Sequence, residues 1–433
     1  MEEHEKDLED VPDMNKKNSI IESGEAMDQL ITIDGEERIT SHNEFEPVPL
    51  TNNLNADELD PETTAKLRGD AIGDTLYSQS FVLKTLLKFA DLNWNQQFEE
   101  DLCFLWDMTA EKSVCEYLWE LSFPSVACGA VAKYTENRFI EIVIGTLANV
   151  LCVGCDKTMT KEEIGVIIQE LDSDDHLVLI QVMRFISSVA FSSSETPFID
   201  EEAMNRLCFV LNNSINTELL LKTLETTAKL TVDFKLDKNL VNSSLYNAVL
   251  TAYCTLLGSA YLELDTKDGI LACRYMLENV TNICGYIDRF ENATLKLDIT
   301  ENLDGFLQEA IKIIKYLSQE ENLLPVTDDT IFFMSAFQYI FINLNVNYSP
   351  EIFIAISKIL YIVSEIRNEV ERLFESTLEL ECFLISRSTK QRIFKDLKLL
   401  SKHKRKTVLD VVLENGPKFH FAFDLKDLKD EVT

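Results

Sequence analysis

The sequence contains few of the residues that turn or break a chain. Only 13 of its 433 residues are glycine and 9 are proline, so a sheet-rich fold with many tight turns is disfavoured. Apolar residues make up 46% of the chain, which is enough to bury a large core. Leucine, isoleucine, glutamate and lysine are abundant and favour helices. These proportions indicate a helical protein.

Positive charge is also in short supply. The chain has 40 lysines and arginines against 74 aspartates and glutamates, which gives a formal net charge of -34. Phosphate backbones and anionic membrane surfaces repel such a chain, because both are bound through clustered basic residues. We therefore expect no nucleic-acid partner and no membrane partner. A protein partner of basic composition suits this charge, and the oligomeric state is left open.

Residues that carry out catalysis or hold metals are scarce. The five histidines include no pair at metal-ligand spacing. Cys152 and Cys155 form a lone Cys-x-x-Cys pair, whereas a structural zinc site needs four ligands. The acids at 172–175 lack the glycine and glutamate of a calcium loop. No phosphate-binding glycine loop and no serine-hydrolase motif is present. We expect no enzyme, cofactor or metal ion, and a cysteine enzyme without a known motif is the enzymatic alternative.

Long apolar segments are absent as well. The first residues show no apolar segment behind a basic one, so no signal peptide is expected. The longest apolar stretch, residues 139–155, is broken by Glu141 and is shorter than the ~20 residues that span a bilayer. The ten cysteines show no disulfide spacing. These features predict reduced thiols in the cytosol or nucleus.

The residues that are present divide the chain into three parts. Residues 1–62 hold 19 acids and 4 bases without a helical stripe, so we expect a disordered acidic tail. Residues 63–416 show recurring helical stripes and predict one helical-repeat domain. Residues 417–433 are expected to be a C-terminal tail, in which phenylalanines alternate from Phe419 to Phe423. These rings are expected either to pack back on the last repeat or to dock on a partner.

The helical stripes recur at a spacing typical of solenoids. Four long stripes align on Leu147, Ile186, Leu224 and Leu277, at steps of 39, 38 and 53 residues. Repeats of ~40 residues are typical of armadillo and HEAT solenoids, in which each unit covers the apolar face of the next. The sequence therefore predicts an all-α, armadillo/HEAT-like solenoid of about eight or nine units. The longest step is either an insertion or a misalignment, and a non-repetitive helical domain is the structural alternative.

Residues 101–121 predict two helices separated by a corner. Trp106 lies on the apolar stripe of the first helix, where a large aromatic side chain supplies packing area. Asp107 is expected in the corner, and Thr109 is expected to cap the start of the second helix. Earlier in the chain, Ser78 is expected to cap the first helix.

Three short segments between residues 70 and 155 combine into a specific pattern. A Gly-x-Thr-φ-Tyr-Ser segment is followed by Trp-Asp-Met-Thr and then by a helical segment with a Gly-x-Leu-x-Asn core. The pattern consists of Gly73, Thr75, Tyr77, Ser78, Trp106, Asp107, Met108, Thr109, Gly145, Leu147 and Asn149. In this order the segments resemble the serum amyloid A-like (Saal) family.

The resemblance implies an armadillo-like, non-enzymatic protein that is nuclear and linked to cell proliferation. It carries over no catalytic residue. The leading hypothesis is therefore a protein-interaction scaffold that binds its partner along the solenoid.

A nucleocytoplasmic transport adaptor of armadillo type is the alternative function. Such adaptors line their groove with Trp-x-x-x-Asn on successive long helices. Here Asn149 is present, but Gly145 stands at the tryptophan position, and the next repeat has Arg184 and Ser188 at the aligned positions. The incomplete pattern disfavours the adaptor, and Asn149 is expected to bond the backbone of a neighbouring loop.

The one strongly basic stretch lies near the end of the chain. Residues 387–406 hold nine bases and one acid, with an apolar face at Ile393, Leu397 and Leu400. Its last residues fit a nuclear-import signal, although such short runs also occur as ordinary charged helix ends. The candidate signal consists of Lys402, Lys404, Arg405 and Lys406. We expect a nuclear protein with a cytoplasmic fraction, and rank nucleic-acid binding through this stretch last.

Overall fold

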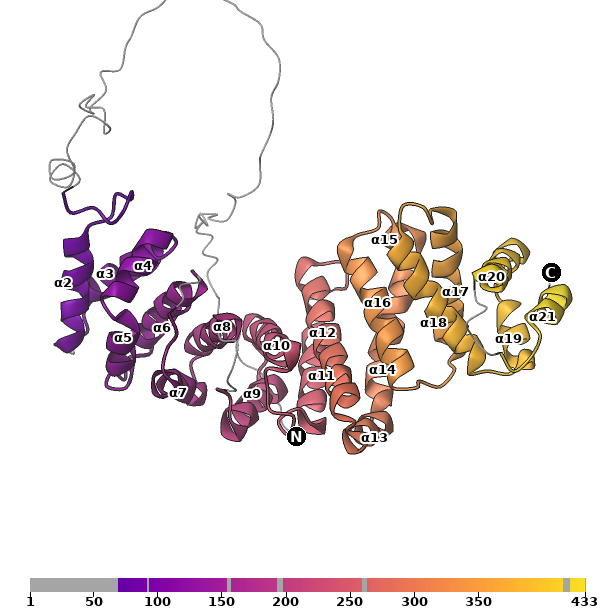
Figure 1. The fold of residues 1–433 in the computed structure, drawn as a ribbon, viewed down its shortest axis with the longest axis horizontal. Helices are drawn as coiled ribbons and strands as arrows, with labels where there is room; N and C mark the ends of the chain where they lie inside the picture. The colour runs from indigo at the N-terminus through magenta and orange to yellow at the C-terminus, as the bar shows by residue number, and fades with distance from the viewer. Residues whose placement is uncertain are drawn as a thin grey trace, which may run out of the picture. The chain divides into compact units, whose positions relative to one another are not determined.

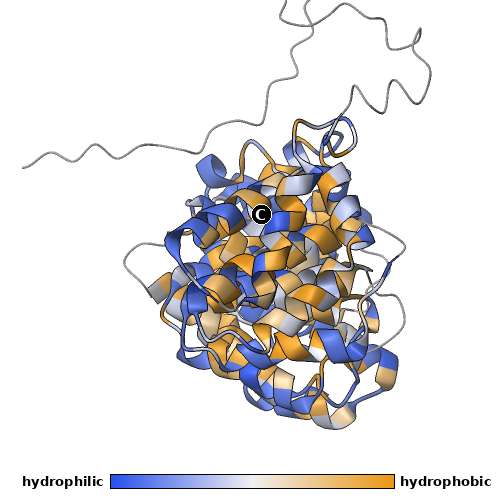
Figure 2. Ribbon diagram, turned by 90° about the vertical axis from the view of Figure 1, so that its left-hand side faces the viewer, coloured by the Kyte–Doolittle hydropathy of each residue, from blue (hydrophilic) through white to orange (hydrophobic). Residues whose placement is uncertain are grey.

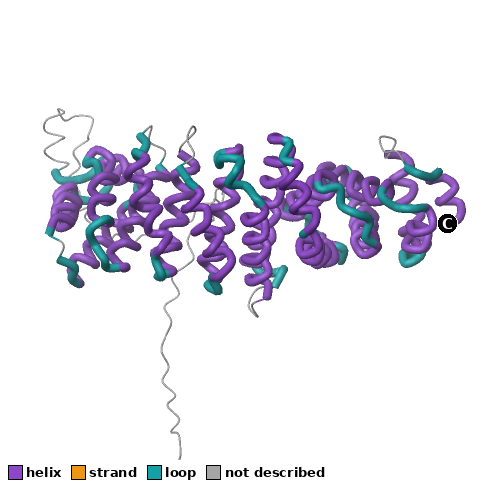
Figure 3. Tube along the Cα trace, turned by 90° about the horizontal axis from the view of Figure 1, so that it is seen from below, coloured by secondary structure: helices purple, strands orange, loops and turns teal. Residues whose placement is uncertain are grey.

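The computed structural model describes residues 69–91, 93–153, 157–192, 198–258, 263–415 and 421–432. The expected acidic tail, residues 1–62, lies outside the described residues and stays a prediction. The chain from Ala65 to Thr433 forms one compact unit by its internal contacts. Within the described ranges every named element is a helix (Figure 3). One isolated β-bridge in these ranges pairs Ala71 with Ser78.

Six helices stack side by side along this unit, and we call them the long-helix layer (Figure 1). Each of them contacts the next, although other helices intervene in the sequence. They are α6 (Asn137–Cys152), α8 (His176–Ser192), α10 (Thr217–Thr231), α12 (Lys267–Phe290), α16 (Asp328–Asn343) and α18 (Glu371–Ser386).

A second row of helices packs against the long-helix layer and connects its members. Its main helices are α5 (Phe123–Val131), α7 (Lys161–Gln169), α9 (Glu201–Asn213), α11 (Ser243–Gly258), α14 (Leu303–Leu317) and α17 (Pro350–Glu365). Here too, α9 contacts α11, α11 contacts α14, and α14 contacts α17. The two rows together make the repeating two-layer arrangement of a solenoid.

The remaining helices complete the two ends and the joints. The N-terminal end consists of α2 (Gln79–Leu87), α3 (Gln96–Met108) and α4 (Lys112–Glu120). The C-terminal end consists of α19 (Lys390–Leu397), α20 (Lys402–Asn415) and α21 (Leu425–Val432). Short elements that connect consecutive helices are α13 (Ala293–Glu301), α15 (Glu320–Leu323) and the 3₁₀ turns η2 (Lys88–Ala90), η3 (Glu170–Asp172) and η4 (Val232–Phe234).

Polar side chains fix where many of these helices begin. The hydroxyl of Ser78 accepts a hydrogen bond from the backbone N–H of Phe81, so the cap expected for the first helix is confirmed. Thr160 and Glu163 form a reciprocal capping box at the start of α7. Pro124 lies in the first turn of α5, where its missing N–H costs no helical hydrogen bond.

A continuous apolar core lies between the helices. Leu147, Ile186, Leu224 and Leu277, which align the sequence repeats, are all fully buried in the long-helix layer. In the view of Figure 2, hydrophobic segments fill the middle of the projection and hydrophilic segments occupy much of its outline. The all-α helical solenoid expected from the sequence is therefore confirmed.

The irregular step of 53 residues has a structural cause. A loop with the turn η4 follows α10, and α11 has 16 residues where α9 has 13, so α12 begins only at Lys267. The amide of Asn279 nevertheless donates to the carbonyl of Leu224 at 2.9 Å, which places α12 directly beside α10. The step is thus an insertion, the first of the two explanations that the sequence allows.

The C-terminal residues also pack on the solenoid. Helix α21 contacts α19 and α20, and Phe421 and Phe423 are partly buried against the core. Phe419 lies outside the described residues. Of the two alternatives for the alternating phenylalanines, the structure favours packing on the last repeat. Among the described residues, no helix has the length and apolar character needed to cross a membrane.

Candidate interaction surface

The first segment of the family pattern ties the start of the described chain to α4. Gly73 has a φ of +55°, which favours glycine, and an added Cβ would lie 2.9 Å from the hydroxyl oxygen of Ser113. The hydroxyl of Thr75 donates to the carbonyl of Ile72 at 2.7 Å and closes this turn. Tyr77 packs edge-on against Phe104, with ring centroids 5.9 Å apart. These residues therefore hold a turn in place.

Trp106 and Gly145 bring the second and third segments together. Trp106 on α3 is half-buried and packs against the core, as the sequence predicts. Its indole lies directly over Gly145 on α6, where an added Cβ would be 2.4 Å from the ring atom Cζ2. The glycine of the pattern is therefore the residue that lets the indole approach the backbone of α6.

Two expectations about the corner after Trp106 are wrong. Helix α3 extends to Met108, so Asp107 lies in its last turn and not in the corner. Thr109 ends α3 and does not cap α4, whose N-cap is Glu111 without a side-chain hydrogen bond. The reason is that the Thr109 hydroxyl donates back to the carbonyl of Trp106.

The Thr109 hydroxyl also receives a contact that links three helices. The amide of Asn149 on α6 donates to this hydroxyl at 2.9 Å. The Asn149 carbonyl accepts from the guanidinium of Arg184 on α8 at 2.6 Å. Asn149 therefore bonds two side chains, whereas the sequence predicts a bond to loop backbone. The pattern residues act as a structural clamp that continues into α8.

A ladder of polar contacts continues from this clamp along the layer. The thiol of Cys152 and the hydroxyl of Ser188 lie 3.1 Å apart. The hydroxyls of Ser187 on α8 and Thr226 on α10 lie 3.0 Å apart. Each rung joins one long helix to the next and satisfies polar groups within the stack.

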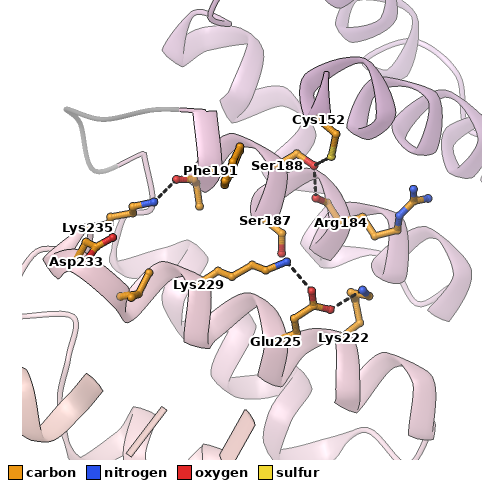
Figure 4. A pocket seen from close by; sticks show the side chains of 12 residues that line it. Cys152, Arg184, Ser187, Ser188, Phe191, Lys222, Glu225, Lys229, Asp233 and Lys235 are labelled. Carbon is orange, nitrogen blue, oxygen red and sulfur yellow. Dashed lines mark hydrogen bonds and ion pairs between the residues drawn. The ribbon is translucent and has the colours of Figure 1, made fainter. Parts of the chain in front are cut away.

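A groove of about 610 Å³ opens where α8, α10 and η4 meet (Figure 4). Lys222 and Lys229 on α10 each donate to Glu225 at 2.5 Å, one to each carboxylate oxygen. Burial by itself raises the pKa of Glu225, but these two hydrogen bonds and charges outweigh it and hold the pKa below its usual value. Glu225 is thus a carboxylate fixed between two ammonium groups.

The turn η4 shapes one end of the groove. Asp233 and Phe234 both have positive φ, at 55° and 59°, which turns the chain sharply after α10. The ammonium of Lys235 then reaches back to the carbonyl of Ala190 on α8 at 2.5 Å. Phe191, which is 80% exposed, adds an apolar wall.

A second set of polar side chains links α12, α16 and α18, and we call it the polar row. Asp288 on α12 accepts hydrogen bonds from Tyr339 at 2.9 Å and from Asn343. Gln338 on α16 donates to Glu379 on α18 at 2.9 Å. Burial, and then the hydrogen bond to Asp288, raise the pKa of Tyr339. The polar row places two acids and a tyrosine on the long-helix layer.

The basic stretch forms α19 and the first turn of α20. Its expected apolar face is confirmed, because Ile393, Leu397 and Leu400 are buried. Two of the four candidate signal residues contact the solenoid. The ammonium of Lys404 lies 5.0 Å from the ring of Tyr361, and Arg405 is half-buried. The candidate signal is therefore part of a folded helix, and its use in import stays a prediction.

Among the cysteines that the structure describes, five thiols are buried, whereas Cys152 and Cys254 are exposed. Burial raises the pKa of Cys128, Cys284 and Cys382 to about 12, so these thiols are protonated at neutral pH. His176 begins α8, and Cys155 lies outside the described residues. No three His, Cys, Asp or Glu side chains of the described residues cluster closely enough to hold a metal ion.

Sequence reasoning missed the groove. Its cationic side chains, on Arg184, Lys222, Lys229 and Lys235, are spread over two helices and a loop. None of them belongs to a basic run, so nothing local in the sequence marks them as neighbours.

Comparisons with known proteins agree with the family pattern. Protein saal1 of Danio rerio is 29% identical over 204 residues, which cover 42% of this chain and 43% of that protein. This chain is similar to the Saal proteins over this part of its length. Protein saal1 of Xenopus tropicalis is 27% identical over a region that covers 40% of this chain and 42% of that protein. Protein SAAL1 of Homo sapiens is 26% identical over a region that covers 40% of this chain and 41% of that protein. The chain thus matches about two fifths of the length of these curated Saal relatives.

Two other comparisons add nothing to this relationship. No family model matches the sequence. A crystal structure of an engineered protein, 14% identical, covers 61% of this chain and 96% of its own with a TM-score of 0.41, which is too low to support an argument.

Proposed function

We propose that this chain is a non-enzymatic scaffold for protein interactions, which acts in the nucleus with a cytoplasmic fraction and takes part in the regulation of cell proliferation. The proposal includes no cofactor, metal ion, nucleic acid or membrane. The nuclear and proliferative parts follow from the resemblance to the Saal family, to which the comparisons relate the chain. The candidate signal in α20 supports the nuclear location.

The polar row is the observation that carries the scaffold proposal. A solenoid presents one long surface formed by successive helices, and such surfaces bind extended partners. Asp288 and Glu379 put negative charge on this surface, and Tyr339 adds an amphipathic ring of the kind enriched in interfaces. With a chain charge of -34, the surface suits a basic partner that is steered by the surrounding field.

Proximity labelling in cells tests the compartment and the partner together. We expect labelled proteins to be nuclear and rich in basic segments. A variant with Lys402, Lys404, Arg405 and Lys406 changed to alanine should shift the labelling to cytosolic proteins. A variant with Asp288→Asn and Glu379→Gln should keep the compartment and lose the basic partners. Labelling no different from that of the free labelling enzyme would contradict the scaffold.

A nucleocytoplasmic transport adaptor is the second candidate, and one observation favours it. Tyr339 and Asn343 repeat the aromatic-x-x-x-Asn spacing on α16. The amide nitrogen of Asn343, however, donates to Asp288 within the stack, and the amide oxygen of Asn343 is buried, so this side chain is poorly placed to hold the backbone of a bound peptide. Gly145, at the first tryptophan position, is covered by Trp106. The adaptor therefore ranks below the scaffold.

A further inference from the structure

The groove between α8 and α10 reverses the charge of the chain. Acids outnumber bases 74 to 40 over the whole sequence. The groove is lined by four basic side chains, including Arg184 and Lys235, against the two acids Glu225 and Asp233. The formal charge of the groove is therefore positive, although the net charge of the chain is strongly negative.

The cations of the groove keep hydrogen-bonding capacity for a ligand. Lys222 and Lys229 are both held by Glu225, and an ammonium has three N–H donors, of which each uses one there. Arg184 donates to Gln181 and Asn149 and has further donors on the same guanidinium. These internal contacts fix the positions of the charges, so a ligand meets a preorganised site.

Apolar side chains stand beside these charges. Phe191 is 80% exposed and Val232 is 38% exposed, and both line the groove. The volume of about 610 Å³ falls in the range of ~300–1,000 Å³ that is usual for small-ligand sites, so it suits a few residues of a peptide better than a folded surface.

We propose that this groove binds a short acidic segment of another protein, in which carboxylates flank an apolar side chain. The carboxylates would meet the four cations, and the apolar side chain would cover Phe191 and Val232. A nucleic acid fits less well, because Glu225 and Asp233 repel a continuous row of phosphates. The site differs in place and in charge from the polar row, and does not depend on the basic partner proposed above.

Fluorescence anisotropy of the full chain tests this proposal with a defined probe. The probe is a short labelled peptide with one phenylalanine flanked by glutamates. Comparison probes replace the glutamates by lysines, replace the phenylalanine by serine, or use a thymidine oligonucleotide of equal charge. We expect the glutamate-phenylalanine peptide to bind best, with an affinity that falls as salt is added.

Charge-neutral variants identify the site. Changing Lys222, Lys229 and Lys235 to glutamine should weaken binding of the peptide by about tenfold, because three exposed ion pairs with the peptide are lost. The matched control changes Lys161, Lys267 and Lys296 to glutamine, removes the same charge elsewhere, and should leave the affinity unchanged. Thermal melting of both variants shows whether they fold.

A second variant keeps the test decisive if the lysine variant is unstable. Phe191→Ser alters a side chain that is 80% exposed, so the fold does not depend on it. Phe191→Ser should weaken binding of the peptide that contains phenylalanine and leave binding of the peptide that contains serine unaffected. Equal binding by the lysine variant and its control, preference for the lysine peptide or the oligonucleotide, or no binding at all would each overturn the proposal.

Discussion

At the residue scale, the packing at Gly145 leaves no room for a side chain. A Cβ there would lie 2.4 Å from the indole of Trp106. We predict that Gly145→Ala lowers the free energy of unfolding by about 1–3 kcal/mol, because overpacking outweighs the better helix propensity of alanine. Chemical denaturation measures the change. Gly165→Ala on α7, where no atom lies within 4 Å of the added Cβ, is the control and should be neutral or stabilising.

A double-mutant cycle separates this contact from other effects. Trp106→Ala alone should destabilise the chain through lost packing, and by less than the ~3–5 kcal/mol of a fully buried ring because Trp106 is half-buried. In that background, Gly145→Ala should cost little, since the clash is gone. Simple additivity of the two changes would show that the indole and the glycine do not depend on each other.

Glu381 is a second residue whose environment has a measurable consequence. It is fully buried on α18, where one carboxyl oxygen accepts from the hydroxyl of Ser357 at 2.7 Å and the other has no hydrogen-bond partner among the described residues. Burial raises the pKa of Glu381 from 4.5 to about 8. Between about pH 4.5 and pH 8, Glu381 is therefore protonated in the folded chain and ionised in the unfolded chain.

Because the folded state binds this proton more tightly, the contribution of Glu381 to stability is greatest below about pH 4.5 and decreases up to about pH 8. The slope from this single group is at most ~1.4 kcal/mol per pH unit. Glu381→Gln should remove this decline, which urea denaturation across the window would measure. An unchanged pH dependence in the variant would contradict the assignment.

At the element scale, α20 combines a candidate signal with a packing contact. Lys402 and Lys406 are exposed, whereas Lys404 lies over Tyr361 and Arg405 is half-buried. If import machinery reads the folded helix, Lys402→Ala with Lys406→Ala should reduce nuclear accumulation without changing the melting temperature. Lys404→Ala with Arg405→Ala should lower the melting temperature. Imaging of a tagged chain and thermal melting distinguish the two pairs. Unchanged nuclear accumulation of both variants would contradict the candidate import signal.

The elements also show what sequence could predict. Helical stripes and the cap at Ser78 depend on residues three or four apart, and these predictions are confirmed. The cap predicted at Thr109 is wrong, because the Thr109 hydroxyl donates back to the carbonyl of Trp106 and accepts from Asn149, 40 residues away. The groove depends on contacts between residues 35 to 45 apart, such as Lys235 with Ala190. Polar contacts across stacked helices have no periodicity, so they appear only once the stacking is known.

At the scale of the whole molecule, one solenoid carries two candidate binding regions of opposite charge. The groove lies at α8 and α10, and the polar row lies on α12, α16 and α18. A scaffold with two such regions can hold an acidic segment and a basic partner at once, because neither ligand competes for the charges that bind the other.

This arrangement predicts independent responses to two pairs of substitutions. Asp288→Asn with Glu379→Gln should weaken binding of a short lysine-rich peptide several-fold, because each change removes a negative charge that attracts the peptide. The same change should leave binding of the glutamate-phenylalanine peptide unaffected. Lys222→Gln with Lys229→Gln should weaken binding of the glutamate-phenylalanine peptide and leave binding of the lysine-rich peptide unaffected. Anisotropy titrations with both peptides on both variants provide the four values. If either variant weakened both peptides equally at matched melting temperature, the chain would respond through its net charge alone, and the two regions would not be separate sites.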